Sequence, residues 1–216
     1  MNSVKTLSIT VLAGCVTLVA LLLLDLPVPA AGAKLIASSA FVGVAIASGA
    51  LQSTYGRFLL AGLALSWCGD MFLVGTSRTA FLSGLVAFLL AHIAYVTAFI
   101  RLGYDRTWTV AAAVPVTVVA IVVFAWLQPH IPADLDIPVR AYIAVISVMV
   151  IFAFGARGAG GSILILIGAL LFFLSDLSVA SSRLVQTDFP NYVWGLPFYY
   201  GGQLCLALSV SQSRSH

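Results

Sequence analysis

Eight long apolar stretches restrict the fold of this chain more than any other feature of its sequence. A helix that crosses a bilayer needs about 20 mostly apolar residues. Continuous stretches of this kind do not fit a membrane β-barrel, whose strands alternate in character over about ten residues. We therefore expect eight membrane-spanning helices, near residues 4–24, 35–51, 58–74, 80–100, 108–127, 139–154, 162–180 and 194–211.

The composition agrees with a chain that lies almost entirely within lipid. Of the 216 residues, 62% are hydrophobic and 8% are charged, whereas about 25% of the residues of a soluble domain are charged. A water-soluble fold of this size would lack the charges to cover its surface, and no basic run indicates a nucleic-acid partner. We expect an all-α polytopic membrane protein, a bundle with a single transmembrane domain over residues 1–216 and no soluble domain.

The first apolar stretch allows two interpretations. Leu12–Cys15 resembles the cleavage site of a bacterial lipoprotein, after which a polar mature segment would follow. Here the apolar residues continue to Leu24, so we expect a spanning helix instead.

The distribution of Lys and Arg predicts the orientation. With an even number of spans, both termini lie on one side of the membrane. That side holds six basic residues, Lys5, Arg57, Arg101, Arg106, Arg157 and Arg214. The other side holds four, Lys34, Arg78, Arg140 and Arg183. Because cytoplasmic loops carry an excess of Lys and Arg, we expect a protein of the bacterial inner membrane with both termini in the cytoplasm.

Two acids inside the apolar stretches are the strongest functional signal. Asp70 and Asp176 lie in the third and seventh stretches, and no Lys or Arg is close on the same stretches to neutralise either one. A carboxyl group near the centre of a spanning helix costs about 2.5–3.5 kcal/mol on insertion scales. The two stretches run in the same direction, so both acids lie toward one side of the membrane. They are either a buried reactive pair or two independent hydrogen-bonded acids.

A histidine in the fourth stretch is a further candidate. His92 and Tyr95 are three residues apart and therefore share a helix face. His92 is either a hydrogen-bonded packing residue or a member of the site. One His and two Asp could also bind a metal ion, but no spacing typical of a metal motif supports that interpretation.

Polar residues also open the eighth stretch, and basic residues flank the acids. Tyr199, Tyr200 and Gln203 either anchor and pack this helix or line a pocket, and Tyr200 and Gln203 share a face. The four basic residues on the side of the acids are expected one in each loop. They either contact lipid head groups or hold the phosphate of a lipid substrate near the acids.

The chain resembles the lysoplasmalogenase, or YhhN-like, family of multi-pass membrane proteins. The resemblance rests on an ordered set of segments, Ser66–Leu73, Phe81–Leu85, Ala91–Tyr95, Gly168–Asp176 and Tyr199–Gln203, together with Lys34, Phe88, Tyr142 and Met149. It covers most of the chain from Lys34 to Gln203. Each segment has only one or two polar residues, so the resemblance depends on the order of the segments along the chain.

The resemblance implies an eight-helix bundle that hydrolyses the vinyl ether bond of lysoplasmalogens. The products would be a fatty aldehyde and a glycerophospho-ethanolamine or -choline. It implies that Asp70 and Asp176 are the catalytic pair. The residues expected to bind the substrate are Lys34, His92, Tyr95, Tyr142, Tyr199, Tyr200 and Gln203. The expected partners are a lysophospholipid and the lipid bilayer, and no oligomeric state is predicted.

Two acids suit this chemistry. Protonation of the alkene carbon gives an oxocarbenium ion, which water captures, as in glycoside hydrolysis. A proton donor and a carboxylate are sufficient, so no metal or organic cofactor is expected. Two other functions remain open from the residues alone. Intramembrane Asp and His also serve proton relays, which would suit a proton-coupled transporter of a small molecule or lipid. A lipid-binding protein without enzymatic activity is the other.

Overall fold

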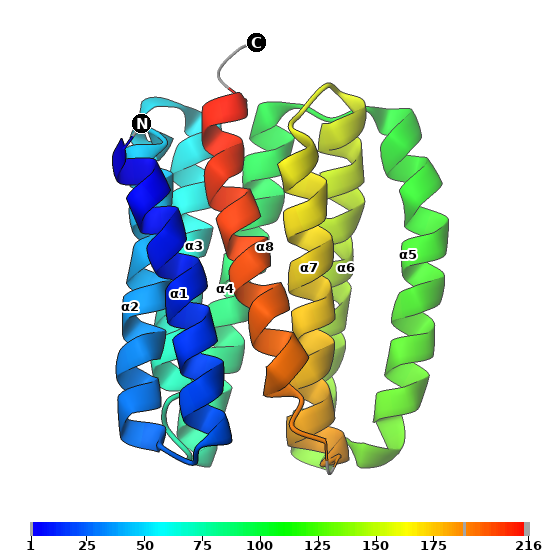
Figure 1. The fold of residues 1–216 in the computed structure, drawn as a ribbon. Coiled ribbons are helices and arrows are strands. Elements are labelled where there is room, and N and C mark those ends of the chain that lie inside the picture. Colours follow the sequence, from blue (N-terminus) through cyan, green and yellow to red (C-terminus); the bar gives the residue numbers. More distant parts are fainter. Residues whose placement is uncertain (1, 188, 214–216) are drawn as a thin grey trace.

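A computed structural model describes residues 2–187 and 189–213, and this part of the chain forms an all-α, multi-pass membrane protein. Its eight α-helices run side by side along one axis (Figure 1). They are α1 (Asn2–Leu23), α2 (Pro27–Ala47), α3 (Thr54–Phe72), α4 (Arg78–Leu102), α5 (Arg106–Leu127), α6 (Asp136–Gly158), α7 (Ile163–Ala180) and α8 (Tyr192–Gln212). Short 3₁₀ turns occupy Ala50–Gln52, Gln128–His130 and Ala133–Leu135, and a π-helical turn, Ser181–Val185, continues α7.

Polar residues at the helix starts explain where the helices begin. The side chains of Ser53, Ser77, Asp105 and Ser162 each accept a hydrogen bond from a backbone N–H in the first turn that follows. Such caps satisfy donors that the helix itself leaves free. The first turn of α2 instead holds Pro27, whose missing N–H costs nothing there.

All eight predicted helices are present in the described residues, but one of them begins well before the predicted residue. The α2 helix begins at Pro27 and not near residue 35. Lys34 therefore lies about two turns inside α2, and Arg140 lies about one turn inside α6, so the assignment of these two residues to loops was wrong. Within the described part of the chain, six segments have the length and hydropathy of a membrane span by themselves, and α3 and α8 are not among them. These two helices carry much of the polar interior described below.

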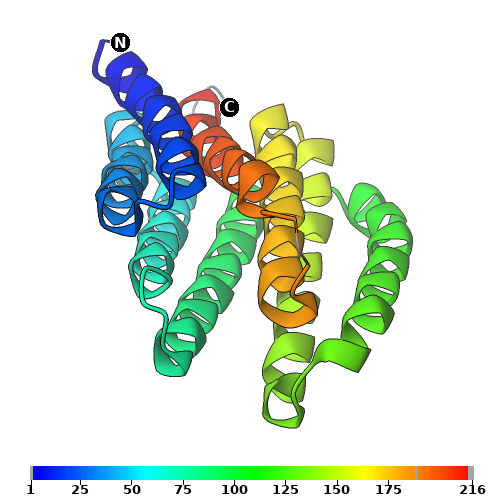
Figure 2. The ribbon, with the colours of Figure 1, turned by 60° about the horizontal axis from the view of Figure 1, so that its bottom comes forward.

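The helices form a ring around the interior of the bundle. Neighbours in the ring are α2 and α3, α3 and α4, α4 and α6, α6 and α7, α7 and α8, and α8 and α2. The α1 helix packs outside the ring against α2 and α8, and α5 lies apart on the far side, packed against α6 (Figures 1 and 2). From α2 to α8, the helices therefore follow one another around the ring in chain order, except that α5 is left out between α4 and α6.

Successive helices alternate in direction, so α1 begins at the same end of the bundle at which α8 ends (Figure 1). The α3 and α7 helices both run away from that end, and Asp70 and Asp176 lie near their final turns. The two acids are therefore at the same end of the bundle, opposite the chain termini. Arg214, one of the basic residues counted on the side of the termini, lies outside the described residues.

Glycines allow α7 and α8 to approach closely. A Cβ atom added to Gly168 would lie 2.9 Å from the carbonyl oxygen of Gly202, and the reverse distance is the same. Small residues of this kind let helix backbones meet in membranes, where close packing drives association. The contact holds α8 against α7, and the Tyr199 and Phe172 rings pack at 5.4 Å between their centroids.

Candidate active site

A cavity of about 590 Å³ lies inside the bundle and includes both intramembrane acids in its lining. All eight helices contribute side chains to it, and most of these are apolar. Ligand cavities in proteins commonly measure about 300–1,000 Å³, so this one has room for an acyl chain. Lys34, Tyr142 and Tyr199, which were expected to bind a substrate, also line it.

Asp70 is held by three donors from two other helices. Ser38 on α2 donates to its Oδ2 at 2.6 Å, and Tyr199 on α8 donates to the same oxygen at 2.7 Å. The Lys34 ammonium lies 3.3 Å from Oδ1. Asp70 is only 2% exposed. A buried carboxylate requires such compensation, and every contact here suits the ionised form, which only accepts hydrogen bonds.

The ion pair with Asp70 gives Lys34 a structural partner inside the bundle. One of the two interpretations of the sequence has Lys34 hold a substrate phosphate, but in the structure its charge is paired with Asp70. Lys34 and Ser38 are four residues apart and so occupy one face of α2. The sequence spacing thus places Ser38, which sequence reasoning missed, on the face of Lys34, and the packing of α2 against α3 brings that face to Asp70.

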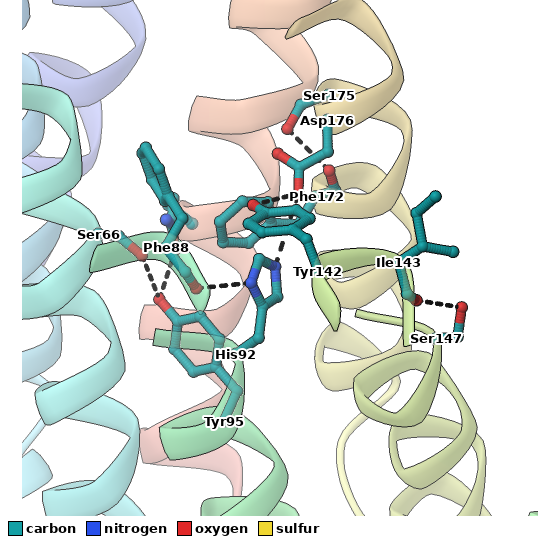
Figure 3. Close-up of polar contacts among 11 residues, drawn as sticks. Ser66, Phe88, His92, Tyr95, Tyr142, Ile143, Ser147, Phe172, Ser175 and Asp176 are labelled. Atoms are coloured by element: carbon teal, nitrogen blue, oxygen red, sulfur yellow. Dashed lines mark hydrogen bonds and ion pairs between the residues drawn. The ribbon is translucent and has the colours of Figure 1, made fainter. Parts of the chain in front are cut away.

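Asp176 has a different environment. Tyr142 on α6 donates to its Oδ2 at 2.8 Å, and Nε2 of His92 on α4 lies 3.7 Å from the same oxygen (Figure 3). Its side chain is 17% exposed. No described Lys or Arg pairs with Asp176, and no described residue donates a hydrogen bond to its Oδ1. The two acids thus differ: one is compensated by a cation, and the other is not.

The hydrogen bond on the far side of the His92 ring decides what the ring offers to Asp176. Nδ1 lies 2.6 Å from the Phe88 carbonyl oxygen, which can only accept, so Nδ1 carries the hydrogen. Nε2 of the neutral ring is then an acceptor, and it has no hydrogen-bond partner in the described structure. It faces the Asp176 carboxyl group (Figure 3). A protonated carboxyl can donate toward Nε2, whereas a carboxylate would bring two acceptors face to face.

Four residues predicted to bind substrate lie behind the cavity and not along it. His92, Tyr95, Tyr200 and Gln203 are fully buried and absent from the lining. Tyr95 donates to Gln203 at 2.9 Å. It also bonds the Ser66 hydroxyl at 3.2 Å (Figure 3). Tyr200 bonds Ser38 at 3.1 Å. In the structure these side chains contact residues of the site and do not reach the lining of the cavity.

The sequence model of the YhhN family matches residues 5–210, which include every site residue described above. This chain belongs to the YhhN family. A Mycobacterium bovis protein named lysoplasmalogenase is 35% identical over 157 residues, which cover 69% of this chain and 59% of that protein. A Sus scrofa protein named lysoplasmalogenase TMEM86B is 32% identical over 159 residues, covering 74% of this chain and 66% of the relative.

A Homo sapiens protein named lysoplasmalogenase TMEM86A is also similar, with 30% identity over 171 residues, 72% of this chain and 66% of the relative. The chain thus spans about three fifths of the length of the mycobacterial relative. No solved structure matches the chain.

Three aromatic rings pack together within this YhhN fold, and two of them, Phe88 and Phe172, were not among the predicted site residues. Phe88, Phe172 and Tyr199, from α4, α7 and α8, have centroids 5.4–6.1 Å apart in edge-to-face arrangements. A Cβ atom at Gly69 would lie 2.6 Å from the Phe88 ring, so the residue before Asp70 must be small. Tyr199 also donates to Asp70, and the centroid of the Phe172 ring lies 4.6 Å from that of the His92 ring, so the three rings contact both polar clusters.

The metal interpretation finds no support in the described residues. No group of three or more His, Cys, Asp or Glu among residues 2–187 and 189–213 could hold a metal ion. His92 lies near Asp176, while Asp70 is engaged by Lys34, Ser38 and Tyr199.

Proposed function

We propose that this chain hydrolyses the vinyl ether bond of lysoplasmalogens to a fatty aldehyde and a glycerophospho-ethanolamine or -choline. One observation carries the proposal: Asp70 and Asp176 line a single, mostly apolar cavity that has room for an acyl chain. The names of the relatives in bacteria and mammals support the same substrate.

We assign the proton donor to Asp176. It has no cationic partner among the described residues, and its neighbour His92 presents an acceptor nitrogen. Transfer of the Asp176 proton to the outer carbon of the double bond leaves an oxocarbenium ion beside the new carboxylate. General acid catalysis of this kind contributes about 10²–10⁴-fold. His92 and Tyr142 act as positioning residues that hold the carboxyl group and its proton.

Asp70 has the complementary role of a fixed carboxylate. Its three donors hold it in place before the reaction, so it stabilises the cation without reorganisation. It takes a proton from the water that attacks the cation, which gives a hemiacetal. Collapse of the hemiacetal returns one proton from Asp70 to the departing glycerol oxygen and one from the hemiacetal hydroxyl to Asp176. Both acids then have their starting protonation states.

The test is hydrolysis by purified protein in detergent, with release of the aldehyde as the measurement. Asp70→Asn and Asp176→Asn should each lower kcat at least about a hundredfold. The kcat of the double variant should be only slightly below that of the less active single variant, because the two acids act as a unit. Asp105→Asn is the matched control, since Asp105 caps α5 outside the cavity and Asn also caps helices.

Two results would refute the proposal. One is wild-type protein that leaves lysoplasmalogen intact. The other is an Asn variant at either acid that keeps more than about a tenth of wild-type activity, which general acid–base catalysis does not allow. A proton-coupled transporter is disfavoured because both acids lie at one end of the bundle, so the two acids by themselves do not form a relay across the membrane.

We further propose that the protein resides in the bacterial inner membrane with both termini in the cytoplasm. The excess of Lys and Arg at the end of the bundle that holds the termini supports this orientation. The cavity and its acids then lie toward the periplasmic face.

A further inference from the structure

The lining of the cavity contains two basic side chains, and only one of them is paired with a described acid. Lys34 lies inside the cavity, and its charge is paired with Asp70. Arg183 lines the cavity from the π-helical turn that follows α7, and this residue is exposed. Among the described acids, none pairs with Arg183. Its guanidinium lies over the Phe81 ring, 5.6 Å from the centroid, and Phe81 also lines the cavity.

Two other arginines at the same end of the bundle are placed differently. Arg78 pairs with Asp134, and Arg140 pairs with Asp136 at 2.8 Å. Neither arginine belongs to the cavity lining. Arg183 is thus the described arginine that combines a place at the cavity with a charge that no described carboxylate neutralises.

The separation of Arg183 from Asp176 matches a dimension of a lysophospholipid. They are 183 − 176 = 7 residues apart along one helical segment, which corresponds to roughly 10 Å at 1.5 Å per residue. In a lysoplasmalogen, seven bonds connect the phosphorus atom to the vinyl ether carbon that accepts the proton. Extended, this path measures roughly 9 Å with ordinary bond lengths. A phosphate at Arg183 would therefore place the double bond at the depth of Asp176.

We propose that Arg183 binds the head-group phosphate of the lysolipid and so sets which bond of the substrate reaches Asp176. The proposal rests on the proposed function and deepens it by naming a residue that selects for phosphate. A guanidinium can bind a phosphate through two parallel hydrogen bonds, which fixes position as well as charge. The acyl tail then occupies the apolar part of the cavity.

Kinetics with two substrates tests this role. The substrates are a lysoplasmenyl-ethanolamine and a 1-O-alkenylglycerol, which has the same vinyl ether but no phosphate. Arg183→Gln should raise KM for the phospholipid about 10–100-fold, as expected for loss of a charged hydrogen bond, and leave KM for the alkenylglycerol within about twofold. Arg183→Lys should recover part of the loss. Arg140→Gln is the matched control, since Arg140 also stacks on a ring, that of Phe124, at this end.

A binding measurement separates this inference from the proposed function. A 1-O-alkyl-lysophosphocholine has a saturated ether that cannot be protonated at carbon, and its Kd can be measured by calorimetry in detergent. Arg183→Gln should weaken its binding about 10–100-fold, with no change for 1-O-alkylglycerol. If wild-type protein hydrolyses neither vinyl ether but Arg183→Gln selectively weakens binding of the phospholipid analogue, the proposed function fails and the role of Arg183 stands. Equal effects of Arg183→Gln on both lipids, or no effect, would overturn the role of Arg183 whether or not the protein is active.

Discussion

Replacing Lys34 by Met tests the ion pair at the centre of the site. The substitution keeps much of the side-chain volume but removes the ammonium 3.3 Å from Asp70. The Lys34 and Asp70 side chains are 14% and 3% exposed, so water does little to compensate the remaining carboxylate. Removal of one partner from a buried pair costs about 3–5 kcal/mol. A chain of this size changes its Tm by about 2–4 °C for each kcal/mol, so Lys34→Met should lower Tm by roughly 6–20 °C.

The assay is thermal unfolding in detergent, measured together with hydrolysis. The double variant Lys34→Met/Asp70→Asn removes both charges and should recover most of the lost Tm, since neutral replacements of buried pairs are often tolerated. Its activity should stay as low as that of Asp70→Asn. Lys5→Met, at an exposed position at the other end of the bundle, is the control and should leave Tm unchanged.

A Tm for Lys34→Met within about 2 °C of wild type would contradict this reasoning, because it corresponds to less than about 1 kcal/mol. So would a double variant that is less stable than Lys34→Met, since the charge left on Asp70 would then not be the cause of the loss.

Two further substitutions test the polar interior and the packing of α8. Tyr95→Phe removes hydrogen bonds to two buried partners and should lower the free energy of unfolding by about 1–3 kcal/mol. KM for the lysolipid should not change, because Tyr95 does not line the cavity; a rise in KM would show a direct contact. Gly202→Leu should separate α8 from α7 and cost about 1–3 kcal/mol in unfolding experiments. Gly201→Ala, whose Cβ would meet its nearest neighbour at 3.6 Å, should be tolerated, and equal stability of both variants would exclude the packing argument.

The number of helices and the position of the two acids at one end of the bundle could be read directly from the residues. Backbone groups in lipid must be hydrogen-bonded within the segment, so an apolar stretch of spanning length has little choice but a helix. The alternation of eight helices then placed Asp70 and Asp176 at one end, as the structure has them. Their cost within an apolar stretch singled them out without any knowledge of their neighbours.

The partners of those acids depended on the tertiary structure. Helix periodicity describes neighbours three or four residues apart, whereas Lys34, Ser38 and Tyr199 reach Asp70 from other helices. Their assignment required the order of helices in the ring and the true start of α2, which a proline in the first turn moved toward the N-terminus. For the same reason, the sequence could not separate Tyr199, which lines the cavity, from Tyr200, which lies behind it. Adjacent residues on a helix point in different directions, and only the packing of α8 against its neighbours decides which of them faces the substrate.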